Sequence, residues 1–288
     1  MAHALDMLGQ AQSGTDEICN LQFHGTENGH DMMTMVRRAA ALIVAGVLCV
    51  AATAPADEIR VMISGGFSAA YLDVVPEFER ATGNKVVASF GASMGDAPDA
   101  IPSRLRRGEP VDVLILADSA LDDLMKQGRV RAGSRVDLAR SSIGMVVRAG
   151  APRPDISSSD ALRRALLQAK SIAYSASASG VYLSTELFQR LGIADEIKGK
   201  SRKIESERVA AVVARGEAEI GFQQISELLP VAGVDYVGPL PHEAQRVTVF
   251  SAGVAAGARA PDAATVLIRF LASPAVAPAI RKSGMEPF

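Results

Sequence analysis

Short apolar runs alternate with amphipathic segments along most of the chain after residue 56. The runs EIRVMIS, KVVASF and VDVLILA are rich in β-branched and aliphatic residues, as strands covered on both faces are. Between them, apolar residues recur at helical spacing, for example at Tyr71, Val74 and Phe78. The pattern predicts strands that alternate with helices, which is typical of an α/β fold.

The same pattern sets the expected elements and their arrangement. The expected strands are 58–64, 85–90, 111–117, 143–149, 171–175, 219–223 and 248–257. The expected helices are 69–83, 99–108, 158–169, 181–192, 206–216, 262–271 and 274–283. Because helices connect successive strands, we expect the sheets to be parallel.

The expected elements form two α/β units. The chain ends in helices whose apolar faces must pack on a sheet, which suggests that the end of the chain returns to the first unit. This predicts a two-lobed α/β fold in which each lobe is a sheet flanked by helices. We expect 57–140 together with 246–288 to form lobe 1, and 141–245 to form lobe 2. A ligand would lie in the interlobe cleft, where the carboxyl ends of strands and helix N-termini converge. A single doubly wound domain of about 230 residues is the alternative, although it is large for one core.

Residues 35–56 have the pattern of a secretory signal peptide. Two arginines precede an unbroken apolar run that ends in the sequence APA, which predicts cleavage after Ala56 and localisation in the periplasm. A membrane anchor is the alternative, which we disfavour because the apolar run is short for a bilayer span. Residues 1–34 are polar and unpatterned, so we interpret them as an artefactual or mis-started extension, with translation from Met33 or Met35.

The residue inventory excludes several classes of chemistry. After residue 56 the chain holds no cysteine and a single histidine, His242, which excludes thiol catalysis and a Cys/His zinc site. A Ser-His-Asp triad would need His242, and no nucleophile-elbow pattern accompanies it. The acidic residues are scattered without metal-ligand spacing, so we expect no metal and no other cofactor. No polybasic stripe suggests nucleic acid or a membrane surface, and we expect a monomer.

Three turns between a predicted strand and a predicted helix carry small polar residues. Their candidate ligand-binding residues are Gly65 and Gly66 in SGGFS, Ser93 and Met94 in GASMGD, and Ser177, Ser179 and Gly180 in YSASASGVY. Missing side chains let a ligand approach the backbone, and free N–H groups at a helix start favour negative charge. Ordinary serine N-capping is the alternative for each turn alone. Three such turns together favour a small anionic ligand.

Other polar side chains complete the expected site. Arg104 follows the second turn and can act as a charge partner for an anion. Gln223 and Gln224 directly follow the strand EIGF, where their amides can orient carboxylate or hydroxyl oxygens. We interpret Arg106 as facing solvent. Arg208, early in the SERVAAVV helix, can line the mouth of the same site or face solvent, and we favour solvent.

The order of the motifs SGGF, EFERATG, SFGAS, RRGEPVDVLILAD, SASGVY and ARGEAEIGFQQ resembles the periplasmic molybdate-binding proteins of ABC importers. The resemblance covers nearly all of 57–288. It implies the type II solute-binding fold, in which two lobes close around an oxyanion and present a surface to an ABC permease. It also implies that Ser93 is the second-turn ligand and that Ser179 lies where the third turn supplies a backbone donor.

Departures from that family change the expected ligand. The serine usual in the first turn aligns with Gly66, and the tyrosine of the second lobe aligns with Gln224. The segment between Ser93 and Arg107 is also longer than usual. Fewer oxyanion ligands and a wider turn favour an organic polycarboxylate over molybdate, so the first functional hypothesis is a solute-binding protein for such an anion.

The segments SMGDAPDAIPSRLRRGEPVDV, SASGVYLS and VVARGEAEIGFQQISEL also resemble the bacterial aconitate isomerases, which share this fold. That resemblance implies interconversion of cis- and trans-aconitate by an allylic proton shift. The reaction needs a base near the methylene carbon and donors for the carbanion. Asp96, Tyr182 or an activated serine are the candidate bases, although Asp96 also suits an N-cap. Binding protein and isomerase both stay open.

Overall fold

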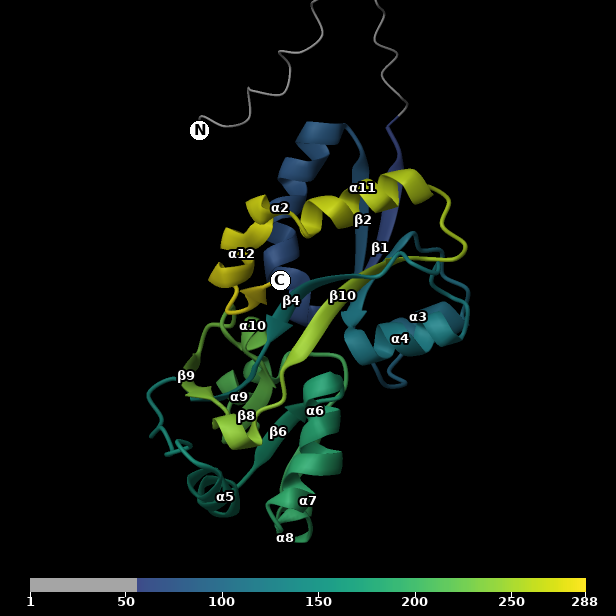
Figure 1. The fold of residues 1–288 in the computed structure, drawn as a ribbon. Helices are drawn as coiled ribbons and strands as arrows, with labels where there is room; N and C mark the ends of the chain where they lie inside the picture. Colours follow the sequence, from purple (N-terminus) through teal and green to yellow (C-terminus); the bar gives the residue numbers. More distant parts are fainter. Residues whose placement is uncertain (1–55) are drawn as a thin grey trace, which may run out of the picture. The chain divides into compact units, whose positions relative to one another are not determined.

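The computed structural model of the protein describes residues 56–288 as two mixed β-sheets with helices on their faces (Figure 1). We call the six-stranded sheet with its helices the first lobe and the five-stranded sheet with its helices the second lobe. The expected two-lobed α/β fold is therefore confirmed. The predicted extension 1–34, and all of the predicted signal peptide except Ala56, lie outside the described residues.

The sheet of the first lobe has the strand order β11-β4-β10-β3-β1-β2. Its strands are β1 (Glu58–Ser64), β2 (Lys85–Gly91), β3 (Val113–Ala117), β4 (Val136–Ser141), β10 (Thr248–Val254) and β11 (Glu286–Pro287). Strand β1 is parallel to β2 and β3, as expected, but β10 is antiparallel to both β3 and β4. The expectation of a wholly parallel sheet is wrong here because β10 returns from the second lobe in the opposite direction.

The sheet of the second lobe has the strand order β7-β6-β8-β5-β9. Its strands are β5 (Ile143–Arg148), β6 (Ile172–Ser175), β7 (Ser201–Ile204), β8 (Ile220–Gln224) and β9 (Val234–Pro239). Strand β6 is parallel to β7 and β8, whereas β5 is antiparallel to β8 and β9. The parallel strands β6 and β8 therefore end at the same edge of this sheet.

The longer helices follow the expected apolar pattern, while several shorter ones differ from it. The first-lobe helices are α2 (Gly65–Thr82), α3 (Ile101–Arg106), α4 (Asp118–Lys126), α11 (Pro261–Leu271) and α12 (Ala277–Lys282). The second-lobe helices are α5 (Ser159–Gln168), α6 (Ala178–Tyr182), α7 (Phe188–Arg190), α8 (Ala194–Lys198), α9 (Val209–Ala214) and α10 (Ile225–Leu228). A π-helical turn, Leu183–Leu187, joins α6 to α7. No single helix within 56–288 has the length and hydropathy of a membrane span, and only the bent pair 261–271 and 274–282 meets the criterion jointly.

The SGGFS turn is itself the first turn of α2. The helix begins at Gly65, directly after the last residue of β1, and not at residue 69 as expected. It ends where expected, because Gly83 adopts the left-handed conformation with φ of 76° and donates its N–H to Glu79 O. The early start places the helix N-terminus at the carboxyl end of β1.

Each sheet is covered by apolar side chains on both faces. In the first lobe, α2 and α11 pack on one face through Phe67, Phe78 and Leu267, and Figure 1 shows these two helices beside β1 and β2. Helices α3 and α4 cover the other face through Ile101 and Leu121. Burial of such side chains is the main source of stability for each lobe.

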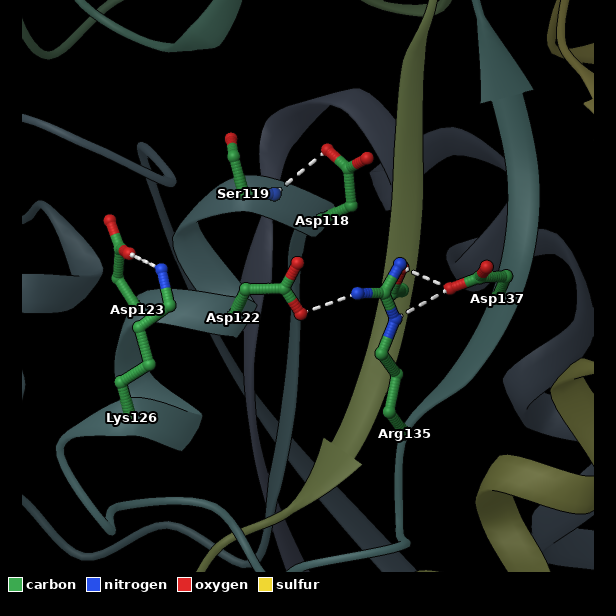
Figure 2. Close-up of polar contacts among 8 residues, drawn as sticks. Asp118, Ser119, Asp122, Asp123, Lys126, Arg135 and Asp137 are labelled. Atoms are coloured by element: carbon green, nitrogen blue, oxygen red, sulfur yellow. Dashed lines mark hydrogen bonds and ion pairs between the residues drawn. The ribbon is translucent and has the colours of Figure 1, made fainter.

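Arg135, which directly precedes β4, reaches across β10 and links α4 to the sheet (Figure 2). Arg135 pairs with Asp122 on α4 and, over 2.9 Å, with Asp137 on β4. Ser251 on β10 donates a hydrogen bond to the same Asp137 oxygen over 2.6 Å. Burial acts to raise the pKa of Asp137, but the bonds from Ser251 and Arg135 outweigh burial and hold that pKa below its usual range.

The chain crosses between the two sheets twice, from β4 to β5 and from β9 to β10. Gln245 joins these crossings, because its Oε1 accepts from the N–H of Ile143 over 2.9 Å and its Nε2 donates to Ile143 O over 3.0 Å. Gln224 is paired with Ile143 in the β5–β8 register, and its Nε2 donates to Thr248 Oγ1 over 2.8 Å. The crossings therefore form a hydrogen-bonded connection between the lobes.

Candidate ligand site between the two lobes

A cavity of about 280 Å³ lies between the two lobes, and we call it the interlobe cavity. It lies at the carboxyl ends of parallel strands from both sheets, as expected for this kind of fold. From the first lobe it is lined by Ser64, Gly65, Ser68, Leu72, Phe90 and Asp99, among others. From the second lobe it is lined by Ser177, Ile204, Glu207, Arg208, Gln223 and Glu227, among others.

The N-terminus of α2 forms one wall of the interlobe cavity. Ser64 is the N-cap residue, is only 3% exposed and makes no side-chain capping bond. Gly65 leaves open a space in which Glu227 Oε1 lies, so a β-carbon at this position would collide with that oxygen. The first N–H groups of an α-helix lack intrahelical partners and lie at its positive end. This wall of the cavity therefore favours a negatively charged group.

Glu227 brings a buried carboxyl group into the interlobe cavity. It lies on α10, which packs against α2, and is 9% exposed. Burial raises the pKa of Glu227 to about 7, although the Arg208 charge and a hydrogen bond from the Gln223 side chain act in the opposite direction. A carboxyl group with this pKa exchanges protons readily near neutral pH.

The neighbours of Glu227 are fixed by the start of α9. The N–H of Val209 donates to Gln223 Oε1 over 2.9 Å. The amide nitrogen of Gln223 is therefore the atom that donates to the Glu227 carboxyl group. Arg208 is the N-cap residue of α9 and is partly buried. Its guanidinium has no salt bridge to an acidic side chain within residues 56–288. The favoured placement of Arg208 in solvent is wrong, and the alternative placement at the site is correct, because Arg208 lines the cavity.

The other acidic side chains around the interlobe cavity are engaged by nearby donors. Asp99 Oδ1 accepts a hydrogen bond from Ser206 over 2.8 Å, which also links the two lobes. Glu205 pairs with Lys203 over 2.9 Å. Glu207 pairs with Arg215 over 2.9 Å. Lys203 and Arg215 therefore offset the negative charge of Glu205 and Glu207, whereas Asp99 keeps its charge and is held by a neutral hydroxyl.

The second predicted turn contacts the third across the lobes, and only its first two residues, Gly91 and Ala92, line the interlobe cavity. The N–H of Ser93 donates to Ser177 Oγ over 3.2 Å. Ser93 Oγ accepts from the N–H of Ala117 over 3.0 Å. Ser177 lines the interlobe cavity, whereas Ser93 and Met94 line a different cavity of about 370 Å³ beside α3 and α4. Ser93 and Met94 as ligand residues stay predictions.

The serines of the third turn bond largely to one another. Ser175 Oγ and Ser179 Oγ are 3.1 Å apart, and the N–H of Ser177 donates to Ser175 Oγ over 3.2 Å. A β-carbon on Gly180 would collide with Ser175 O, so this glycine is required for packing. Of these residues, Ser175 and Ser177 line the interlobe cavity, while Ser179 and Gly180 are buried behind it.

Three further predicted ligand residues lie outside the cavity lining. Gly66 O accepts a hydrogen bond from Ser226 over 2.6 Å, and its missing side chain leaves room for Phe250. Gln224 is buried, with its amide nitrogen on Thr248 and its Oε1 without a partner among the described residues. Arg104 donates to Asp99 O over 3.0 Å and pairs with Glu109 over 2.8 Å.

Two of the candidate bases predicted from the sequence, Asp96 and Tyr182, also lie away from the interlobe cavity. The Asp96 side chain is 91% exposed and pairs with Arg106 over 2.9 Å. Tyr182 is 3% exposed, and its hydroxyl donates to Ala244 O over 2.8 Å and accepts from Arg190 over 2.9 Å. Neither residue lines the interlobe cavity, and their catalytic roles stay predictions. Within residues 56–288, no group of three or more acidic, His or Cys side chains is placed to hold a metal ion.

Residues 59–286 match the profile of a protein family described as bacterial extracellular solute-binding protein. The chain belongs to this family. Within the family it is 48% identical over 247 residues to an aconitate isomerase from a Pseudomonas species, which covers 86% of this chain and 94% of the relative. It is 31% identical over 193 residues to the molybdate-binding protein ModA of Azotobacter vinelandii, which covers 65% of this chain and 73% of the relative.

Solved structures of solute-binding proteins share the fold of this family member. The periplasmic molybdate-binding protein of Azotobacter vinelandii matches with a TM-score of 0.65 at 20% identity, over 79% of this chain and 98% of that one. A sulfate-binding protein, SubI from Mycobacterium tuberculosis, matches with a TM-score of 0.61 at 19% identity, over 80% of this chain and 87% of that one. The resemblance to the molybdate-binding proteins and the aconitate isomerases is thus confirmed.

Proposed function

We propose that the interlobe cavity binds an organic tricarboxylate and that the protein interconverts cis- and trans-aconitate. The structural observation that carries this proposal is the interlobe cavity itself, which combines the open N-terminus of α2, an arginine without a salt bridge in the described chain and an apolar wall. The 48% identity to an aconitate isomerase over nearly all of that enzyme supports the same activity.

The lining suits a carbon skeleton that carries several carboxylates. Leu72 and Phe90 are exposed apolar side chains at the cavity, and Ile204 lies on the opposite lobe. Such a surface suits carbon atoms, whereas molybdate consists of a metal and oxygens. The volume of about 280 Å³ is close to the lower end of the range of ~300–1,000 Å³ for small-molecule sites. Arg208 and the N–H groups that follow Gly65 would then hold carboxylates.

The proposed reaction moves one proton and one double bond. A C–H bond of the substrate's methylene group breaks, and the electron pair spreads over the adjacent double bond and carboxylate. A proton then adds at the far carbon of this allyl system, so the double bond moves by one position. Because aconitate carries a carboxylate on each of these carbons, the shift converts one geometric isomer into the other with no net gain or loss of atoms.

A solute-binding role without chemistry is the second candidate. It is supported by family membership and by the 31% identity to a molybdate-binding protein. In this case the lobes, proposed as 57–140 with 246–288 and 141–245, close on the anion and present a surface to an ABC permease in the periplasm. The proposal includes export through the signal peptide at 35–56.

Incubation of the purified protein with trans-aconitate separates the two functions. We expect the ultraviolet absorbance of the double bond to change until the isomers reach equilibrium, with chromatography identifying cis-aconitate. Arg208→Ala should slow the conversion, while Arg106→Ala, at an exposed ion pair, should not. Thermal stabilisation by trans-aconitate without any conversion would favour the solute-binding role.

A further inference from the structure

A buried carboxyl group, that of Glu227, lines the interlobe cavity. Glu227 extends from α10 in the second lobe to the start of α2 in the first lobe, where its Oε1 lies against Gly65. It is buried yet lines the cavity, so a bound ligand can reach it while bulk water has little access. This is the placement that proton transfer to carbon requires.

The surroundings of Glu227 distinguish it from the other acidic residues at the cavity. Lys203 pairs with Glu205, Arg215 pairs with Glu207, and Ser206 donates to Asp99. Glu227 has no salt bridge in the part of the chain that the structure describes, and Arg208 is the one charged group that acts on it there. Its carboxylate is therefore the acidic group at this cavity that is free to accept a proton.

The position of Glu227 is held from two sides. The hydrogen bond from the N–H of Val209 fixes the Gln223 amide group, so that its nitrogen donates to the Glu227 carboxyl group. The missing side chain of Gly65 admits the carboxyl group from the other side. A fixed base beside the N–H groups of α2 can remove a proton while those groups and Arg208 stabilise the charge on the substrate.

We propose that Glu227 is the base of the isomerisation and removes the methylene proton of aconitate. The inference rests on the proposed function. The C–H electron pair stays on the allyl system, and the proton bonds to a Glu227 oxygen. Glu227 then gives this proton to the carbon at the other end of the allyl system. One carboxyl group thus acts as base and then as acid, and no co-reactant is needed.

The raised pKa of Glu227, about 7, gives this proposal a pH signature. The free protein needs Glu227 ionised, so kcat/KM should rise with pH through the pKa and level above it. Arg208 is the charged group that acts on Glu227, and Gln223 and the start of α2 carry no titrating side chain. The proposal therefore assigns the acid limb of the profile to Glu227, and Glu227→Gln tests this against the other carboxyl groups of the cavity, Asp99, Glu205 and Glu207.

The test compares the wild type with Glu227→Gln and with Glu217→Gln, a matched change at an exposed ion pair outside the cavity lining. We expect Glu227→Gln to lower kcat by about 100-fold or more, as loss of a general base does. It should keep calorimetric binding of trans-aconitate and a cooperative thermal transition. Its residual rate should lack the acid limb, while Glu217→Gln should match the wild type.

The outcomes separate the base from the function. Conversion by the wild type together with near-normal kcat in Glu227→Gln would overturn Glu227 as the base and leave the isomerase standing. A residual rate that keeps the acid limb near pH 7 would overturn it as well. No conversion by the wild type would overturn the isomerase and the inference together.

Discussion

Glu227 Oε1 occupies the space that a β-carbon on Gly65 would need, so residues 162 positions apart share one small volume between the lobes. Gly65→Ala should therefore displace the Glu227 carboxyl group from the start of α2. Because a misplacement of about 1 Å can cost about 100-fold in rate, we expect a loss of up to this size in kcat/KM for trans-aconitate. Steady-state kinetics measure it.

The control for this change is Gly199→Ala. An added β-carbon at Gly199 meets nothing within 4 Å, and the residue follows α8 away from the interlobe cavity. This variant should keep wild-type kinetics. If Gly65→Ala were equally silent, Glu227 would not depend on the space at Gly65.

Arg208 is predicted to contribute binding free energy more than thermal stability. It has no salt bridge to an acidic partner among residues 56–288, so its removal breaks no ion pair there. Arg208→Ala should weaken calorimetric binding of trans-aconitate by about 10- to 100-fold, the value of a charged hydrogen-bond partner. Arg106→Ala serves as the control, and equal affinities in the two variants would count against Arg208 as a ligand.

Glu227 should also make the stability of the folded protein depend on pH. Its pKa is raised from the ordinary 4.5 to about 7, so between these values the folded chain holds a proton that the unfolded chain has released. The free energy of unfolding should fall as the pH rises from 4.5 to 7, by up to about 3 kcal/mol at ~1.4 kcal/mol per pKa unit.

Denaturant unfolding at several pH values measures this effect. Glu227→Gln carries no titrating group at this position. Its free energy of unfolding, relative to that of the wild type, should therefore increase as the pH rises through this window. Parallel stability curves for the two proteins would show that Glu227 does not hold its proton more tightly in the folded state.

Gly180 is predicted to be a packing residue. A β-carbon there would collide with the backbone oxygen of Ser175, which cannot move without distorting β6. Gly180→Ala should cost about 1–3 kcal/mol of stability through overpacking. Gly257→Ala, where nothing lies within 4 Å, should cost much less. Urea unfolding distinguishes the two variants, and equal stability would contradict a packing role for Gly180.

Much of the fold follows from local patterns in the sequence. Ser158 caps α5 by accepting from the N–H of Ala161 over 3.2 Å, as its place before an amphipathic run suggests. Gly83 ends α2 in the left-handed conformation at the expected position. Strand directions were harder, because β10 is antiparallel owing to its return from the other lobe, which no local pattern shows.

The short elements were hidden for a related reason. Strand β7 has the sequence SRKI and lies at a sheet edge, so charged residues interrupt its apolar pattern. Helix α10 spans only Ile225–Leu228, about one turn, so its sequence cannot show apolar residues that recur at helical spacing. Such elements form because tertiary contacts stabilise them, and those contacts are absent from a local window.

The candidate site was visible in part. Gly65, Ser177 and Gln223 were expected from strand-to-helix turns and do line the interlobe cavity, although their role as ligands stays a prediction. Glu227 was missed because a glutamate in a first helical turn is ordinary in sequence. Its raised pKa arises from burial against α2, a contact between segments far apart in the chain.

Approach to equilibrium from both sides is the most direct test of the central claim that this cavity isomerises aconitate. The purified protein is incubated separately with cis-aconitate and with trans-aconitate, and both isomers are quantified by chromatography over time. We predict that the two incubations converge on the same ratio of isomers, and that Glu227→Gln slows both by about 100-fold or more. Two incubations that keep their starting isomers unchanged would contradict this claim.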